Sequence, residues 1–225
     1  MPRVRFADGR MVTSRMDRKP DRVGYPLHLL DADASVAKSF GVANPVYRRG
    51  LDEFLGRVLA PAPGGRFYAG HRQEYIIEKW DTLGRKVREI VRPASWFRPW
   101  ITEPFIGPDA PKPQPRMQSL HEDDQGRLWV FTQVTQSDWK KFLSQGSKKD
   151  GEREGQWRIG GVTRNTGFDT MIEVIDLRTN RLLVSQRVDE MLWKMFEGGL
   201  AYSDGEDAQL ESYVDIWRLK LIQPR

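Results

Sequence analysis

The fold is decided by a strand type that is clearest in two stretches, Tyr75-Ile-Ile-Glu-Lys-Trp-Asp-Thr-Leu-Gly-Arg85 and Thr170-Met-Ile-Glu-Val-Ile-Asp-Leu-Arg-Thr-Asn-Arg181, with further copies at 25–31 and 213–218. Apolar and charged residues alternate in both stretches, which is the period of a half-buried β-strand. An aspartate closes each of these two strands and begins a turn, Asp81 in the first stretch and Asp176 in the second. A further strand is expected to leave each turn, over 86–91 and 182–188. The sequence therefore predicts antiparallel hairpins at corresponding places.

A second strand type precedes this one and begins with Gly-Arg. It occurs at 9–12, 65–69 and 126–130, with a weaker copy at 199–202. Short apolar segments, 58–60 and 117–120, lie before two of the copies and supply a first strand. Each unit is then four antiparallel strands in about 35–40 residues, which is the size of one propeller blade. A meandering β-sandwich with accidental likeness between strands is the alternative.

These repeats resemble bacterial six-bladed β-propeller proteins of the NHL/TolB-like type, where strand, Asp, turn and Gly-Arg mark the outer hairpin of each blade. The resemblance implies an all-β fold in one domain, 1–225, with about three blades and part of a fourth. The expected blades are 1–48, 50–115, 116–190 and a partial blade 192–222. Because closed propellers have about 4–8 blades, we expect the C-terminal portion of a longer propeller, an open arc, or a ring completed by two copies.

The composition excludes several classes of protein. The 225 residues include 36 Lys and Arg, 31 Asp and Glu, and no cysteine. Disulfides, thiolate zinc sites and cysteine nucleophiles are therefore excluded, and no apolar run of about 18 residues could span a membrane. The first residues do not form the apolar segment of a signal peptide. The resemblance implies a periplasmic or secreted protein if a leader is missing, but the sequence itself leaves localisation open.

Most of the excess positive charge lies in an insertion over 135–168, within the third predicted blade. Long insertions in compact domains are often functional lids or disordered segments. Trp139 and Trp157 are interleaved there with basic residues, among them Lys140 and Lys141, and such a mixture can track a phosphate backbone and stack bases. A solvated loop whose aromatic side chains pack on the propeller rim is the alternative. A short helical turn is also expected over 137–143, and another over 51–56.

A proline-rich segment, 92–115, is predicted to connect two blades over the surface because each X-Pro step favours extended backbone. Trp96, Phe97 and Trp100 are many aromatic residues for a linker. They either cap the core between blades or anchor a partner protein, and a second copy of the chain is the first partner to consider.

Evidence for catalysis is poor, and we assign no catalytic or metal-binding residue. Hydrolases of the lactonase kind hold calcium in the propeller channel, and the comparable side chains here are His71, Glu74, His121 and Asn165, without recognisable spacing. The segment 121–124 reads more simply as a hairpin turn than as a ligand cluster. No cofactor is expected, calcium being the one alternative.

The sequence thus predicts a non-catalytic binding or interaction module with an unknown ligand. Its partner would be another protein or a second copy, bound through an exposed blade edge. The alternatives are a lactonase-like hydrolase with a metal ion in the channel and, ranked last, nucleic-acid binding through the basic insertion. The expected binding residues are two groups of aromatic and basic side chains: Trp96, Trp100, Trp139, Lys140, Lys141 and Trp157.

Overall fold

The computed structural model describes residues 3–15, 17, 19–41, 56–100, 106–145, 157–160, 167–206 and 211–222, and these ranges form an all-β protein. The first sheet contains β1 (Arg3–Arg5), β2 (Met11–Thr13), β3 (Leu27–Leu30) and β4 (Val36–Phe40). The second contains β5 (Arg57–Ala62), β6 (Arg66–His71), β7 (Ile76–Trp80) and β8 (Lys86–Val91). The third contains β9 (Arg116–Glu122), β10 (Arg127–Thr135), β13 (Phe168–Asp176) and β14 (Arg181–Val188). The fourth contains β15 (Lys194–Phe196), β16 (Leu200–Glu206) and β17 (Ser212–Arg218).

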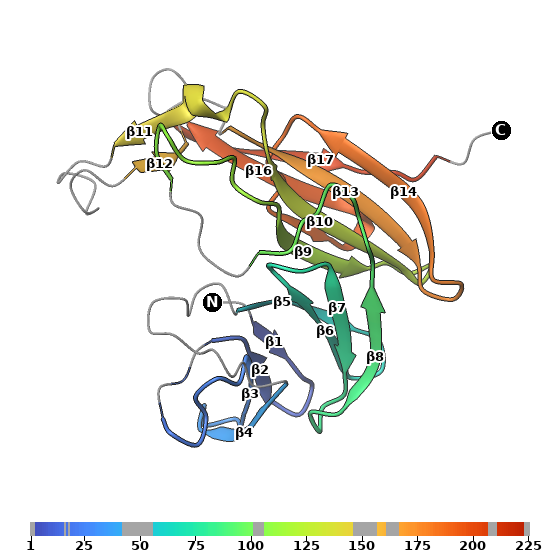
Figure 1. The fold of residues 1–225 in the computed structure, drawn as a ribbon. Coiled ribbons are helices and arrows are strands. Elements are labelled where there is room, and N and C mark those ends of the chain that lie inside the picture. The colour runs from blue at the N-terminus through green and yellow to red at the C-terminus, as the bar shows by residue number, and fades with distance from the viewer. Residues whose placement is uncertain are drawn as a thin grey trace.

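The four sheets are the blades of a propeller (Figure 1). Within each sheet the strands follow one another in chain order and pair antiparallel. The first strands are innermost: β1 lies beside β5, β5 beside β9, and β9 beside β15. The prediction of all-β architecture with three four-stranded blades and part of a fourth is confirmed. A count of six blades is not established, since the described residues form four.

The hairpins owe their shape to a short motif, Asp-x-x-Gly-Arg, which connects β7 to β8 and β9 to β10. In the second of these, the Asp123 carboxylate accepts hydrogen bonds from the backbone N–H groups of Gln125 and Arg127 at 3.0 and 2.9 Å. The carboxylate also accepts one from the Arg127 side chain at 2.7 Å. Gly126 supplies the left-handed conformation that the turn needs, with φ of +70°. Asp81 forms the same bonds with Leu83 and Arg85, so the prediction that this aspartate begins a turn is confirmed.

Three apolar clusters lie between successive blades. Alternate residues of the second blade face opposite neighbours: Phe67 and Trp80 pack on the first blade, whereas Tyr68 and Ile77 pack on the third. Burying each such side chain contributes about 1.5–3 kcal/mol. A third cluster joins the last two blades around Phe131. The blades are therefore joined mainly by side chains on their faces.

The insertion lies between β10 and β13, which pair directly with each other up to Thr135 and Phe168. Its described part forms the 3-10 helix η1 (Trp139–Phe142), β11 (Leu143–Gln145) and β12 (Trp157–Ile159), the two strands pairing antiparallel. Asp138 precedes the helix but makes no capping hydrogen bond with its side chain. A second 3-10 helix, η3 (Glu197–Gly199), connects β15 to β16. The turn expected over 51–56 lies almost wholly outside the described residues.

Candidate binding site

A cavity of about 790 Å³ lies where the inner strands of the four blades meet. Each blade contributes to its wall: Arg3 from β1, Leu59 and its neighbours from β5, Leu120 and its neighbours from β9, and Met195 and its neighbours from β15. Because these strands come from all parts of the chain, the cavity exists only in the folded propeller. This central cavity is the first candidate for a ligand site.

Arg72 reaches the cavity because of a close approach between the second and third blades. It follows the last residue of β6, and its carbonyl accepts a hydrogen bond from the N–H of Met117 on β9 at 3.3 Å. Gly70, two residues earlier, makes the approach possible. A Cβ at that position would overlap the Met117 Sδ and lie 3.0 Å from a methyl carbon of Leu120. The glycine therefore allows β6 to approach β9 closely, two residues before Arg72 lines the cavity.

The cavity wall is basic. Arg3, Arg72 and Lys194 line it, with Glu197 as the acidic residue. Among the described residues, the guanidinium groups of Arg3 and Arg72 have no hydrogen bond or ion pair. Burial, helped by the charge of nearby Arg116, lowers the pKa of Arg72 to about 10. The fold therefore holds a partly desolvated cation against an accessible cavity, which an anion would stabilise.

A second hollow, of about 1080 Å³, adjoins the first, and His121 and Met195 line both. Burial lowers the pKa of His121, which keeps its ring neutral near pH 7. Two of the acidic residues that line this hollow already have a basic partner. The Asp123 carboxylate lies 2.7 Å from the Arg127 side chain, and Glu122 lies 3.2 Å from Lys79. The turn that we predicted for 121–124 therefore holds its aspartate in local hydrogen bonds.

The central cavity continues onto an open face of the fourth blade. Phe196 and Tyr202 line the cavity and stack on each other with ring centres 5.8 Å apart. The Lys194 ammonium lies 5.3 Å from the centre of the Phe196 ring. On the same face Val214 and Ile216 are 62% and 64% exposed. The opposite face of this blade packs on the third blade, so the two faces differ sharply in burial.

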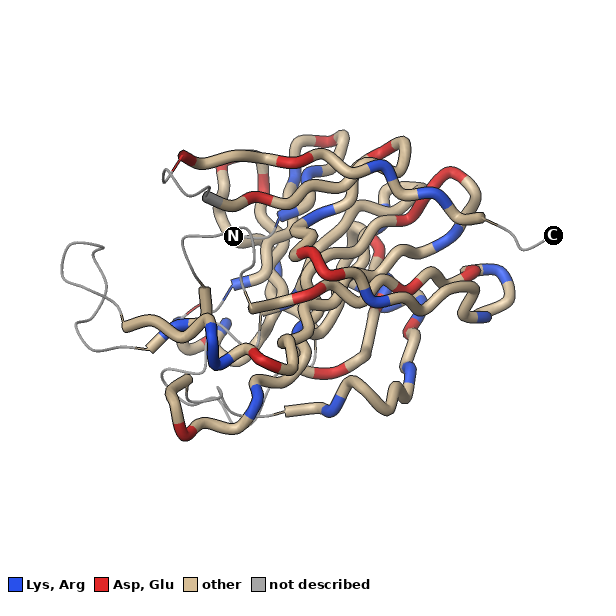
Figure 2. The backbone as a smooth tube through the Cα atoms, turned by 90° about the horizontal axis from the view of Figure 1, so that it is seen from above, with Lys and Arg blue, Asp and Glu red and all other residues tan. Residues whose placement is uncertain are grey.

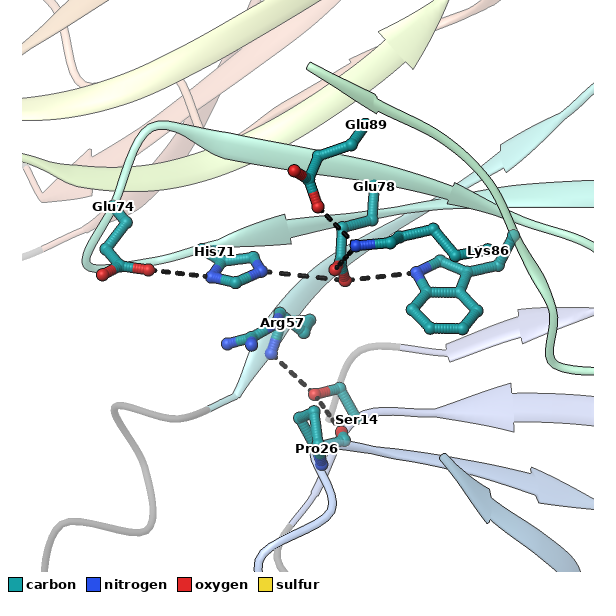
Figure 3. A network of polar contacts seen from close by, with 9 residues as sticks. Ser14, Pro26, Arg57, His71, Glu74, Glu78, Lys86 and Glu89 are labelled. Atoms are coloured by element: carbon teal, nitrogen blue, oxygen red, sulfur yellow. Dashed lines mark hydrogen bonds and ion pairs between the residues drawn. The ribbon is translucent and has the colours of Figure 1, made fainter. Parts of the chain in front are cut away.

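His71 and Glu74, which the sequence suggested for a metal-centred channel, lie in a polar network of the second blade instead (Figure 3). His71 Nδ1 is 3.2 Å from a Glu74 carboxylate oxygen, and its Nε2 is 3.7 Å from Glu78. Glu78 also accepts hydrogen bonds from Trp80 and Lys86. These contacts join the strands of one blade. Asn165 lies outside the described residues.

Two further buried carboxylates connect the second blade to the third. Glu173, 1% exposed, lies within 2.8 Å of Arg92 and accepts a hydrogen bond from Ser185 at 2.8 Å. Glu122 accepts a hydrogen bond from the Tyr68 hydroxyl at 2.7 Å. Removing one partner of such a buried pair is strongly destabilising, so these groups hold the blades in register. Within the described ranges, no group of three or more His, Asp or Glu side chains is placed to hold a metal ion.

Trp96 and Trp100, which we predicted to bind a partner, lie on the connection between the second and third blades. Trp96 packs edge-on against Tyr75 and against Phe97, a residue of the core. The Trp100 indole donates a hydrogen bond to the Pro115 carbonyl at 3.0 Å. Both indoles are half-buried, and Trp96 lines a shallow groove of about 320 Å³ with Met171 and others. A role in binding stays a prediction for both.

The insertion residues are divided between the interior and the surface. Trp139 is 3% exposed, and the Lys140 ammonium lies 5.7 Å from its ring centre. Lys141 pairs with Asp138 at 3.1 Å, and Trp157 is half-buried on β12. Lys and Arg are interspersed with acidic residues over the described part of the chain (Figure 2). The basic residues 148, 149, 153 and 164 lie outside the described residues, so nucleic-acid binding through this segment is not tested.

Sequence reasoning missed the basic cavity wall, although a signal for two of its residues was present. The inner strands β1, β5, β9 and β15 each begin with a basic residue: Arg3, Arg57, Arg116 and Lys194. Of these four residues, Arg3 and Lys194 line the central cavity, whereas Arg57 and Arg116 do not. Alignment of the repeats on their first strands would therefore have pointed to part of the basic wall, but not to Arg72, which follows β6.

No family model matches the sequence, and no curated protein matches it either. Among solved structures, the chain is similar to a member of the DUF4221 family from Bacteroides vulgatus, with 11% identity and a TM-score of 0.47. The match covers 94% of this chain, which spans 62% of the length of that protein. The protein's own fold defines its class, a β-propeller with four blades described. No helix in the described part of the chain is long and apolar enough to cross a membrane.

Proposed function

We propose that this protein is a non-catalytic binding module and that its central cavity holds a small ligand bearing a carboxylate or phosphate group. The observation that carries the proposal is the unpaired guanidinium of Arg72 in the wall of a 790 Å³ cavity. Arginine presents a planar fork of N–H donors that matches carboxylate and phosphate oxygens. Arg3 and Lys194, on the same wall, add positive charge that attracts an anion.

The remainder of the wall suits an organic anion rather than a bare ion. Leu59, Leu120 and Met195 supply apolar surface, and Ser119 and Gln118 supply polar groups. Ligand sites of this size are generally apolar with a few polar groups that fix orientation. That this chain is the C-terminal portion of a six-bladed NHL/TolB-like protein stays a separate prediction.

The test is thermal unfolding with citrate and, separately, inorganic phosphate, against sodium chloride of equal ionic strength. A ligand that binds only the folded state stabilises it by about 2.7 kcal/mol at a hundred times its Kd. We expect citrate or phosphate to raise Tm and Arg72→Gln to abolish the increase. Arg66→Gln, which changes an exposed arginine at the start of β6 outside the cavity, is the matched control. Equal stabilisation of the wild type and Arg72→Gln would refute the proposal.

A further inference from the structure

The open face of the fourth blade has the residue pattern of a packed blade face without a neighbour. Pairing places Tyr202 opposite Ile216, Leu200 opposite Arg218, and Asp204 opposite Val214. Residues directly opposite in an antiparallel pair lie on the same face of a sheet. Phe196, which pairs with Leu200, adds a further apolar side chain and is 43% exposed. Apolar side chains therefore occupy the middle of this face.

The other end of the propeller does not offer a matching surface. On the corresponding outer face of the first blade, Thr13, His28 and Leu30 are buried. The segment after β2 lies against His28 on this face: the His28 ring contacts the Arg15 carbonyl at 3.0 Å, and Arg22 pairs with Asp17 beside it. A head-to-tail contact between the first blade of one copy and the fourth blade of another would bring an apolar face against a covered, polar one. Contact between the fourth blades of two copies would instead bring two apolar faces together.

The charges on the open face complement each other when the face meets itself. Asp204 lies at one end of the strands and Arg218 at the other, with Tyr202 and Ile216 between them. A two-fold axis in the plane of the contact and perpendicular to the strands reverses their direction. It therefore places the Asp204 end of each copy against the Arg218 end of its partner. Such a self-complementary contact is the isologous interface of a closed dimer.

We propose that a second copy of this chain packs on the open face of the fourth blade, so that the protein is a two-fold symmetric dimer. Val214 and Ile216 form the centre of the contact, and Asp204 of each copy pairs with Arg218 of the other. Apolar residues at the centre with charges at the rim are the usual arrangement of a protein interface. This goes beyond the binding of an anion, because Val214 and Ile216 line neither hollow.

The test is the mass of the intact chain in solution, measured by sedimentation equilibrium over a wide range of concentration. We expect twice 26.1 kDa for the wild type. Ile216→Lys places a charge in the contact and is expected to weaken the dimer about tenfold or more, since 1.4 kcal/mol corresponds to a factor of ten. Val91→Lys is the matched control, because Val91 is 61% exposed on β8 of another blade.

Charge exchange tests the geometry of the contact. Asp204→Arg and Arg218→Asp should each weaken the dimer, and the double variant should restore it. A monomer at every concentration would overturn the proposal, as would equal dissociation constants for Ile216→Lys and the wild type. Failure of the double variant to recover would exclude the two-fold pairing proposed here. Ile216→Lys should keep the citrate stabilisation of the wild type, so failure of either proposal is recognised separately.

Discussion

Ala34 occupies a position where the β1–β2, β7–β8 and β9–β10 hairpins have glycine, namely Gly9, Gly84 and Gly126. The turn between β3 and β4 has the same backbone bonds as the turn between β9 and β10. Asp31 N–H donates to the Ser35 carbonyl at 2.9 Å, and Ala34 N–H donates to the Asp31 carbonyl at 2.9 Å. Ala34 has φ of +66°, close to the +70° of Gly126. Ala34 and Gly126 therefore adopt the same left-handed backbone conformation.

The expected effect of Ala34→Gly is a gain in stability. An L-residue in the left-handed region costs about 1–2 kcal/mol, and glycine loses about 0.5–1 kcal/mol through the greater freedom of the unfolded chain. The net gain is about 0.5–1 kcal/mol. For a chain of this size, 1 kcal/mol raises Tm by about 2–4 °C.

Gly126→Ala is the reciprocal experiment. A Cβ at Gly126 would have no atom within 4 Å, so its substitution tests the backbone alone and should cost the same amount. Gly84→Ala should cost more, because its Cβ would also lie 3.1 Å from the ring of Phe40. Thermal and urea unfolding of the variants measure these differences. If Ala34→Gly lowers Tm, or if Gly126→Ala leaves it unchanged, the assignment of strain to this turn position is refuted.

Three further predictions concern the blade contacts and the cavity. Gly70→Ala should destabilise the protein by about 1–3 kcal/mol, the usual cost of overpacking, because its Cβ would overlap Met117; an unchanged urea midpoint would contradict this. Arg72→Met should stabilise the unliganded protein by about 1 kcal/mol. Burial lowers the pKa of Arg72 from 12.5 to about 10, and partial exposure to solvent screens part of the free-energy cost of burying the charge. A lower Tm for Arg72→Met would show that the cation has a partner. Burial lowers the pKa of His28 below 6.5, so its contribution to stability is present above pH 6.5 and is lost as the pH falls through the folded-state pKa. The urea midpoint should therefore be lower at pH 5 than at pH 7, and this difference between the two midpoints should be smaller in His28→Leu.

The repeat in the sequence was sufficient to predict the blades because the interactions that form them are local. The Asp81 carboxylate bonds to residues two and four positions later, Leu83 and Arg85. Strand alternation in 75–80 and 170–175 likewise depends on neighbouring residues alone. The number of blades in a complete ring could not be predicted in this way. It depends on the angle between neighbouring blades, which is set by the packing of their faces.

The candidate site was less accessible to prediction. Trp139 and Lys140 were predicted to bind a ligand because aromatic and basic residues are interleaved there, yet the indole of Trp139 is buried in the fold. Arg72, in contrast, belongs to no motif. Its importance arises from its place beside β9 and from the lack of a described partner.

The sequence by itself determined the strand repeats, the aspartate turns and the propeller class, because each is set by contacts between residues close in the chain. Only the tertiary structure decided which side chains surround the central cavity and which blade face stays open. Arg3, Arg72 and Lys194 come from three different blades, and they meet because the inner strands pack side by side. The unpaired charge of Arg72 in that packing has no signature in the local sequence.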